Sequence, residues 1–178
     1  MASKHSPAKT RSGCPVSRAL DVLGDRWSLL LVRDMMVRGY RTFGQFQHSG
    51  EGIATNILAN RLQKLEAAGI AHPEPATKDG RSLHYRLTEK GIALAPVLLE
   101  MLIWGAHHEE TDAPCAAIDH MEQNRAAILA ETYRRWKDRD PRPILPPFTS
   151  PPFIPPPFTA PPITAPSGAH SPKGKSRR

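Results

Sequence analysis

Prolines are distributed very unevenly along the 178-residue chain, because 13 of the 19 lie after Asp140. Proline fixes φ and lacks a backbone N–H, so the stretch PRPILPPFTSPPFIPPPFTAPPITAP is incompatible with a helix or a central strand. It also offers little contiguous aliphatic surface to offset the entropy of ordering. The distribution therefore predicts a folded part that ends near Lys137 and a disordered, partly polyproline II tail over residues 138–178.

The formal charge of +7 belongs to the two ends of the chain. Residues 1–13, which we expect to be disordered, hold three basic side chains, and the tail holds six basic and two acidic ones. In between, residues 18–90 hold eleven basic and eight acidic side chains, whereas residues 91–122 hold six acidic and none basic. A mildly basic front and an acidic back suit a domain that meets phosphate with one face.

Cysteine usage and the N-terminus bear on the compartment. Cys14 and Cys115 are too few and too far apart for a disulfide framework or a CxxC zinc site, which favours a reducing compartment. The first residues lack the apolar segment of a signal peptide. The longest apolar run, residues 92–106, contains Glu100 and is shorter than the ~20 residues that a bilayer span needs. We therefore expect a soluble, cytoplasmic protein without a membrane segment.

Start and stop residues predict three helices in the first third of the chain. Pro15 suits the first turn of a short helix, and Gly24 can end it in the left-handed conformation. Asp25 suits the N-cap of the next helix, RWSLLLVRDMMVR, which is apolar nearly all round and therefore belongs in the centre of a core. A shorter helix with an apolar Phe pair follows at residues 42–48, before the flexible turn SGEG at residues 49–52.

A fourth helix is predicted over residues 54–68, where one face is apolar and the other is rich in amides. Three leucines at i, i+4 and i+7 form a narrow buried stripe: Leu58, Leu62 and Leu65. Gly69 ends the helix. At about 100° per residue, three amides lie on the far side: Asn56, Asn60 and Gln63.

Two short extended segments follow, at residues 70–75 and 83–88, and the Asp79-Gly80 turn signal between them predicts a β-hairpin with a basic tip. Thr88 can cap a long helix that we expect to be kinked near Pro96. The order helix, helix, short helix, helix, hairpin, helix is typical of a winged helix-turn-helix domain, a mainly α fold of the α+β kind.

A last amphipathic helix is predicted over residues 120–137. We expect Asp119 to open it, with Glu122 at the capping-box position. Its apolar face would consist of four residues: Ile128, Leu129, Tyr133 and Trp136.

Several segments in unbroken order over residues 14–105 resemble the HxlR-type winged helix-turn-helix transcriptional regulators, relatives of the MarR-type regulators. These segments are CPVSRALDVLGDRWSLLLVRD, the F-x-x-F step, GIATNILANRLQKLEAAGI, HYRLTEKG and the Leu94, Pro96, Val97, Trp104 pattern. The resemblance implies a domain over residues 14–106 that binds double-stranded DNA as a homodimer, by default as a repressor. It also implies that residues 54–68 form the recognition helix, residues 76–82 the wing, and terminal helices, including a helical extension at 107–137, the dimer contact.

The recognition helix departs from the family pattern. Where similar proteins usually carry Ser before the helix, a basic residue two positions on, and Ser or Thr at the fifth, this chain has Ala54, Asn56 and Ala59. Arg81 lies one position away from the usual basic residue of the wing. The surface that reads DNA is therefore less basic than usual, and neither the operator nor the inducer can be transferred from relatives.

The candidate DNA contacts divide into base readers and phosphate binders. Amide side chains can read adenine bidentately in the major groove, which makes the three outward amides the base readers, around Ala59. Thr55, at the helix N-terminus, suits a phosphate, whereas Arg61 on the flank either reaches phosphate or pairs internally. Lys78 and Arg81 suit phosphates or a minor groove. The alternative is that these amides and charges only solvate a surface helix and a turn.

Cys14 stands where some similar regulators sense oxidants. Arg11, Arg18 and a helix N-terminus near it favour a reactive thiolate, although the same residue could merely pack against the next helix. Cys115 is expected to be incidental.

Other chemistry finds little support in the sequence. The run His107 to Glu110 does not predict a metal site, since adjacent helical positions point about 100° apart. No nucleophile elbow, phosphate-binding glycine loop or HExxH motif is present, so we expect neither an enzyme nor a cofactor. The rival interpretation is an interaction protein whose proline-rich tail docks to an aromatic groove.

Overall fold

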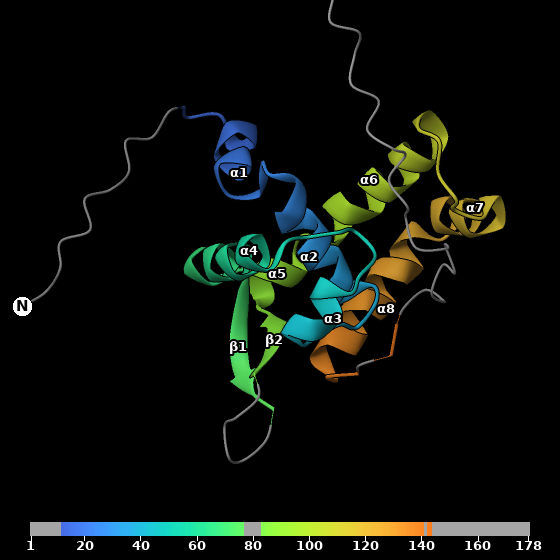
Figure 1. Ribbon diagram of the computed structural model, residues 1–178. Coiled ribbons are helices and arrows are strands. Elements are labelled where there is room, and N and C mark those ends of the chain that lie inside the picture. Colours follow the sequence, from blue (N-terminus) through green and yellow to red (C-terminus); the bar gives the residue numbers. More distant parts are fainter. Residues whose placement is uncertain (1–11, 77–82, 141, 144–178) are drawn as a thin grey trace, which may run out of the picture.

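The computed structural model describes residues 12–76, 83–140 and 142–143. The predicted disorder of residues 1–13 and 138–178 therefore falls almost wholly outside the described residues. The elements follow in this order: α1 (Pro15–Leu23), α2 (Arg26–Met36), α3 (Phe43–Gln47), α4 (Thr55–Ala67), β1 (Ala71–Pro75), β2 (Leu83–Leu87), α5 (Glu89–Ile92), α6 (Ala95–His108), α7 (Cys115–Gln123) and α8 (Arg125–Lys137). Figure 1 shows the hairpin projecting below the helices, with α1 at one end of the molecule and α7 and α8 on the opposite side.

Helix α2 is the central helix, as its nearly all-round apolar sequence predicts. Its buried side chains include Leu31, Val32 and Met35. Asp25 caps it as expected, because Oδ1 accepts the N–H groups of Trp27 and Ser28 at 3.0 Å each. Gly24 does end α1, but the predicted reason, a left-handed conformation, is wrong.

Gly24 has φ −74°, outside the left-handed region. Its N–H donates to the carbonyl of Leu20 at 2.8 Å, and a Cβ at Gly24 would stand 2.4 Å from that oxygen. Glycine is therefore required there for a close backbone approach and not for a positive φ.

Helices α3 and α4 form the helix-turn-helix. Thr42 and Gln45 make a reciprocal capping box at the start of α3, and Phe46 is fully buried. Gly50 and Gly52 take positive φ in the turn that follows. The predicted leucine stripe is buried, since Leu58, Leu62 and Leu65 are each at most 2% exposed, and a left-handed Gly69 ends the helix as expected.

The predicted hairpin is confirmed: β1 and β2 pair antiparallel, with Ala71 opposite Leu87 and Pro75 opposite Leu83. Pro73 lies opposite Tyr85, whose N–H points away from β1 and donates to the carbonyl of Arg41 at 2.7 Å. The prolines thus occupy positions of β1 where the ladder needs no N–H. The basic tip, with Lys78 and Arg81, lies outside the described residues.

The single kinked helix expected after Thr88 is two helices. The Thr88 hydroxyl accepts the N–H of Gly91 and caps α5, but the helix stops at Ile92. Pro96 then occupies the first turn of α6. Proline is tolerated in a first turn because the N–H it lacks would have no intrahelical partner, so the chain breaks and restarts here instead of bending.

The prediction of a helix that begins after Asp119 is also wrong. Asp119 lies inside α7, which runs from Cys115 to Gln123, and α8 starts at Arg125 after a break at Asn124. Helix α8 packs Leu129 and Trp136 against the main core, which is the buried cluster that contains Val32, Phe46 and Leu58. A smaller core lies between α6, α7 and α8 and consists of Leu99, Ile103, Ile118 and Met121.

The segment Glu89–His108 is long and apolar enough, by length and composition alone, to cross a membrane, with a mean hydropathy of 1.2 over the best window. It comprises α5 and α6. One face of it is packed into the protein, because Leu98 belongs to the main core and Ile103 to the smaller one. Helices that pack in the core of a folded domain can meet the same criteria of length and composition, and we interpret α5 and α6 as helices of this kind.

Candidate nucleic-acid interface

The outward face of α4 is the polar face that the helical wheel predicts. Five of the candidate residues on it are exposed: Thr55, Asn56, Ala59, Asn60 and Gln63. Ala54 supplies no side-chain cap, so the first backbone N–H groups of α4 have no partner from that position. A helix N-terminus of this kind suits an anion such as phosphate.

Gln47, at the end of α3, joins this surface and was missed by the sequence analysis. Its Nε2 donates to Oγ1 of Thr55 at 2.9 Å, which fixes the threonine hydroxyl at the start of α4. Lys64 is a second missed residue, exposed in the last turn of α4. Its place beside the amides on the wheel is the signal that could have found it, whereas no sequence signal pairs Gln47 with Thr55.

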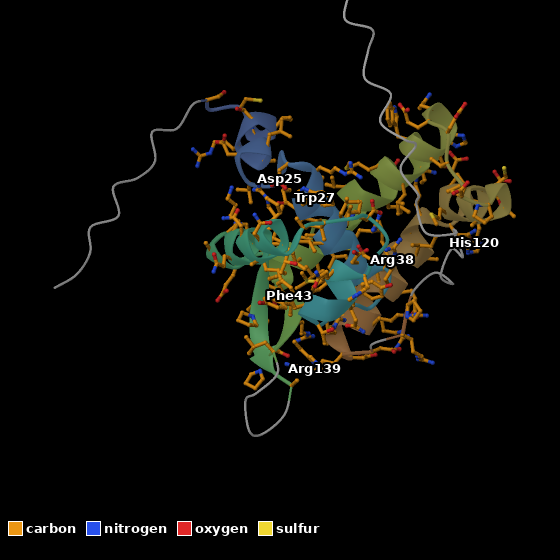
Figure 2. The ribbon with its side chains drawn as sticks, viewed as in Figure 1. Asp25, Trp27, Arg38, Phe43, His120 and Arg139 are labelled. Carbon is orange, nitrogen blue, oxygen red and sulfur yellow. The ribbon has the colours of Figure 1, made fainter. Side chains whose placement is uncertain are left out.

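The sequence left two alternatives for Arg61, a contact with phosphate or an internal pair, and the structure shows the internal pair. Its Nη1 lies 3.1 Å from Oδ2 of Asp25, the residue that caps α2 (labelled in Figure 2). Burial raises the pKa of Asp25, but hydrogen bonds from the side chain and backbone of Ser28 and the charge of Arg61 outweigh it, so the pKa is lowered overall. This pair ties α4 to the start of α2, and we assign Arg61 to positioning α4.

A second set of charges fixes the turn before α4. Arg33 lies 2.8 Å from Asp34 and 3.0 Å from Glu51, and Arg38 donates to the carbonyl of Ser49 at 2.9 Å. Asp34 is 1% exposed. Burial raises its pKa, and the neighbouring Arg33 offsets this only in part. The turn at residues 49–52, flexible by sequence, is therefore held to α2 by the ion pair of Arg33 with Glu51, and to the segment after α2 by the hydrogen bond from Arg38.

Away from α4, two helices expose large apolar side chains. On α1, Val16 and Leu20 are 67% and 58% exposed. On α6, three side chains are about half exposed: Val97, Met101 and Trp104. Lone exposed apolar residues are ordinary, whereas several on one helix make that helix a candidate contact for another protein chain.

The two cysteines are both exposed and free. Cys14 is the N-cap residue of α1, and its N–H donates to Oγ of Ser12 at 3.0 Å. Its exposure does not support the alternative in which it packs against α2. His107 lies 3.0 Å from Glu122, and nowhere in the described parts of the chain do three metal-ligating side chains gather.

A recognition helix with a polar outer face, held on a three-helix core and followed by a hairpin, defines the winged helix-turn-helix class of DNA-binding proteins. The family model for HxlR-like helix-turn-helix proteins matches residues 22–113, and the chain belongs to this family. Helices α7 and α8 lie beyond the match.

Two relatives come from Bacillus subtilis (strain 168), and both are described as uncharacterized HTH-type transcriptional regulators. YybR is 34% identical over 110 residues, which is 62% of this chain and 87% of YybR. YdeP is 32% identical over 115 residues, covering 65% and 84%. Together with the family match, these relatives show that the chain is a transcriptional regulator with a helix-turn-helix DNA-binding domain.

Two solved structures share the fold. The crystal structure of PA1607 is 43% identical, covers 58% of this chain and 71% of its own, and superposes with a TM-score of 0.53. The redox regulator HypR in its oxidized form is 35% identical, covers 55% and 100%, and has a TM-score of 0.50. The fold predicted from the sequence is thus confirmed by solved relatives.

Proposed function

We propose that this protein is a cytoplasmic, homodimeric repressor that binds a pseudo-palindromic DNA operator through α4. The observation that carries the proposal is the outward face of α4, where exposed amides lie beside a helix N-terminus without a side-chain cap. The amides of Asn56, Asn60 and Gln63 read base edges, most naturally adenine. Thr55 and the first N–H groups of α4 bind phosphate, and so do Lys78 and Arg81 on the wing.

The dimer contact in this proposal is formed by the exposed apolar side chains of α1 and α6. The resemblance implies a wider contact, formed by terminal helices that include the helical extension at residues 107–137. The narrower assignment is favoured because Leu129, Thr132 and Trp136 of α8 pack inside their own subunit. A dimer places two recognition helices in successive major grooves, about 34 Å apart.

Binding-site selection from a random duplex pool, with the full-length chain, tests this function. The expected product is an inverted repeat with half-sites one helical turn apart, together with a dimer in sedimentation at micromolar concentration. Trp104→Glu should shift the protein towards monomer and weaken operator binding, whereas Tyr133→Glu on α8 should leave both unchanged. Salt-sensitive binding without sequence preference would reject the proposal.

For regulation, we propose that Cys14 responds to oxidants. The support is its exposure at the start of α1, next to Val16 of the dimer surface, and the likeness to HypR, a redox regulator. Oxidation there can tilt one recognition helix against the other and spoil the half-site spacing. Operator affinity should fall about tenfold after diamide, recover with dithiothreitol and stay constant in Cys14→Ser. Equal affinities throughout would leave the inducer unknown.

A further inference from the structure

Few interactions within the hairpin itself fix its orientation. The hairpin has two strands of only five residues each, and among the described residues no third strand pairs with either of them. An isolated two-stranded hairpin is marginally stable at best in water. The direction in which this hairpin points is therefore set by the elements packed against it.

One side of the hairpin is held by the helix-turn-helix. The ring of Tyr85 meets that of Phe46 edge to face, with centroids 6.2 Å apart, and Ala71 and Leu87 are buried in the main core. At the outer edge of β2, the carbonyl of Arg41 accepts the N–H of Tyr85. These interactions fix the base of the hairpin but leave its other face open.

Helix α8 covers that other face with one side chain in particular. Nε1 of Trp136 donates to the carbonyl of Leu87 at 2.7 Å, the outward-pointing carbonyl of the last β2 residue. The guanidinium of Arg86 lies 5.3 Å from the Trp136 ring centroid and donates to the Trp136 carbonyl. One residue of α8 thus binds β2 through its indole N–H, its ring face and its backbone carbonyl.

The residues after α8 contact the other strand of the hairpin, β1. Arg139, which has φ 57°, directs Nη1 and Nη2 to the two oxygens of Glu74 on β1, at 2.9 and 3.3 Å. Figure 2 shows Arg139 beside the hairpin. Glu74 also contacts Nε2 of His72 at 2.9 Å. Both strands are therefore tied to the C-terminal end of α8.

The other end of α8 is anchored far from the hairpin. Arg125 donates to Glu100 of α6 at 2.8 Å, Leu129 packs against both cores, and Thr132 is 5% exposed. A helix of 13 residues is about 20 Å long, so α8 spans the distance from α6 to the base of the hairpin.

We propose that α8 is a strut that holds the hairpin in its orientation relative to α4, with Trp136 and Arg139 as its positioning residues. The segment beyond the family match at residue 113 is then a working part of the DNA-binding domain and more than a dimerisation extension. This inference rests on the proposed function, because the hairpin strands carry Lys78 and Arg81 to the DNA.

The test uses the full-length chain and two variants, Trp136→Ala and the milder Trp136→Phe, which keeps an aromatic ring but removes the indole N–H. Tyr133→Phe, one turn earlier on α8 and 39% exposed, is the matched control. Hydrogen exchange of the free protein reports on the hairpin itself. Amides of residues 83–87 should exchange about tenfold faster in Trp136→Ala and a fewfold faster in Trp136→Phe, with those of α4 unchanged.

The second readout is binding to a duplex selected by the wild type and to a scrambled duplex of equal composition. Trp136→Phe should weaken both about equally and flatten the log–log salt slope by about 0.9 for each phosphate that the wing no longer neutralises, without changing the preferred sequence. Unchanged exchange, or a changed sequence preference with an unchanged slope, would overturn the strut. A wild type that selects no duplex would reject the proposed function, whereas the exchange data would still decide the role of α8.

Discussion

Helix α4 and the hairpin are the two elements proposed to meet DNA, and they are stabilised in opposite ways. Beyond its first turn, helix α4 makes its backbone hydrogen bonds within itself, and it buries three leucines in the core. The hairpin has two strands of only five residues and depends on Arg41 and Phe46 from one part of the chain and on Trp136 from another, distant part. The element proposed to read bases is thus built locally, whereas the element proposed to bind phosphate is positioned by its neighbours.

The largest expected effect contrasts one leucine from each element. Leu58 on α4 is fully buried, so Leu58→Ala should destabilise the protein by about 2–5 kcal/mol. Leu83 on β2 is 48% exposed, and Leu83→Ala should cost less than about 1 kcal/mol. Urea unfolding at constant m-value measures both. Similar losses of stability for the two variants would contradict the view that Leu58 belongs to the core and Leu83 does not.

The next prediction separates base reading from phosphate binding. Asn60→Ala should cost about 1–3 kcal/mol on the selected operator and leave binding to scrambled DNA nearly unchanged. Lys78→Ala should weaken binding to both duplexes and flatten the salt slope by about 0.9. Gel-shift titrations at several salt concentrations measure both variants. If they behaved alike, the assignment of helix and wing would be wrong.

A third prediction concerns the pair that ties α4 to α2. Asp25→Ala removes the N-cap of α2 and the partner of Arg61, and should destabilise by about 1–2 kcal/mol. Because the pKa of Asp25 is lowered in the folded protein, its contribution is present above the ordinary value of 3.8 and is lost as pH falls through the lower one. Stability of the variant should therefore fall less steeply in acid than that of the wild type. Parallel curves would exclude an ionic role for Asp25.

The smallest effect is expected at Glu131, in the middle of α8. Hydrogen bonds from Arg134 and then Arg135 lower the pKa of Glu131 to about 2. Glu131→Gln should give a smaller decrease in Tm than Asp25→Ala, because the pairs are exposed. The difference from wild type should disappear as pH falls from 4.5 towards 2, since the folded pKa lies below the ordinary one. A difference that persists at pH 2 would show that the effect is not ionic.

Periodicity and cap residues were enough to predict most of the elements. The leucine stripe of α4, the cap at Asp25 and the two paired strands could be predicted because each depends on residues within a few positions of one another. The same local reasoning failed at residues 119–124, where Asp119 and Glu122 match a capping box but lie inside α7. There the packing of Ile118 and Met121 in the smaller core prevailed over a plausible cap.

The sequence by itself determined the fold class, the order of its elements and the outward amides of α4, because hydrophobic period and turn chemistry are local properties of the chain. Only the tertiary structure decided that Arg61 pairs with Asp25, 36 positions away, and that Trp136 and Arg139 hold strands 49 and 65 positions away. Such contacts depend on which helices and strands become neighbours once the core has closed. No spacing in a single sequence records that, because the same side chains are equally able to solvate a surface.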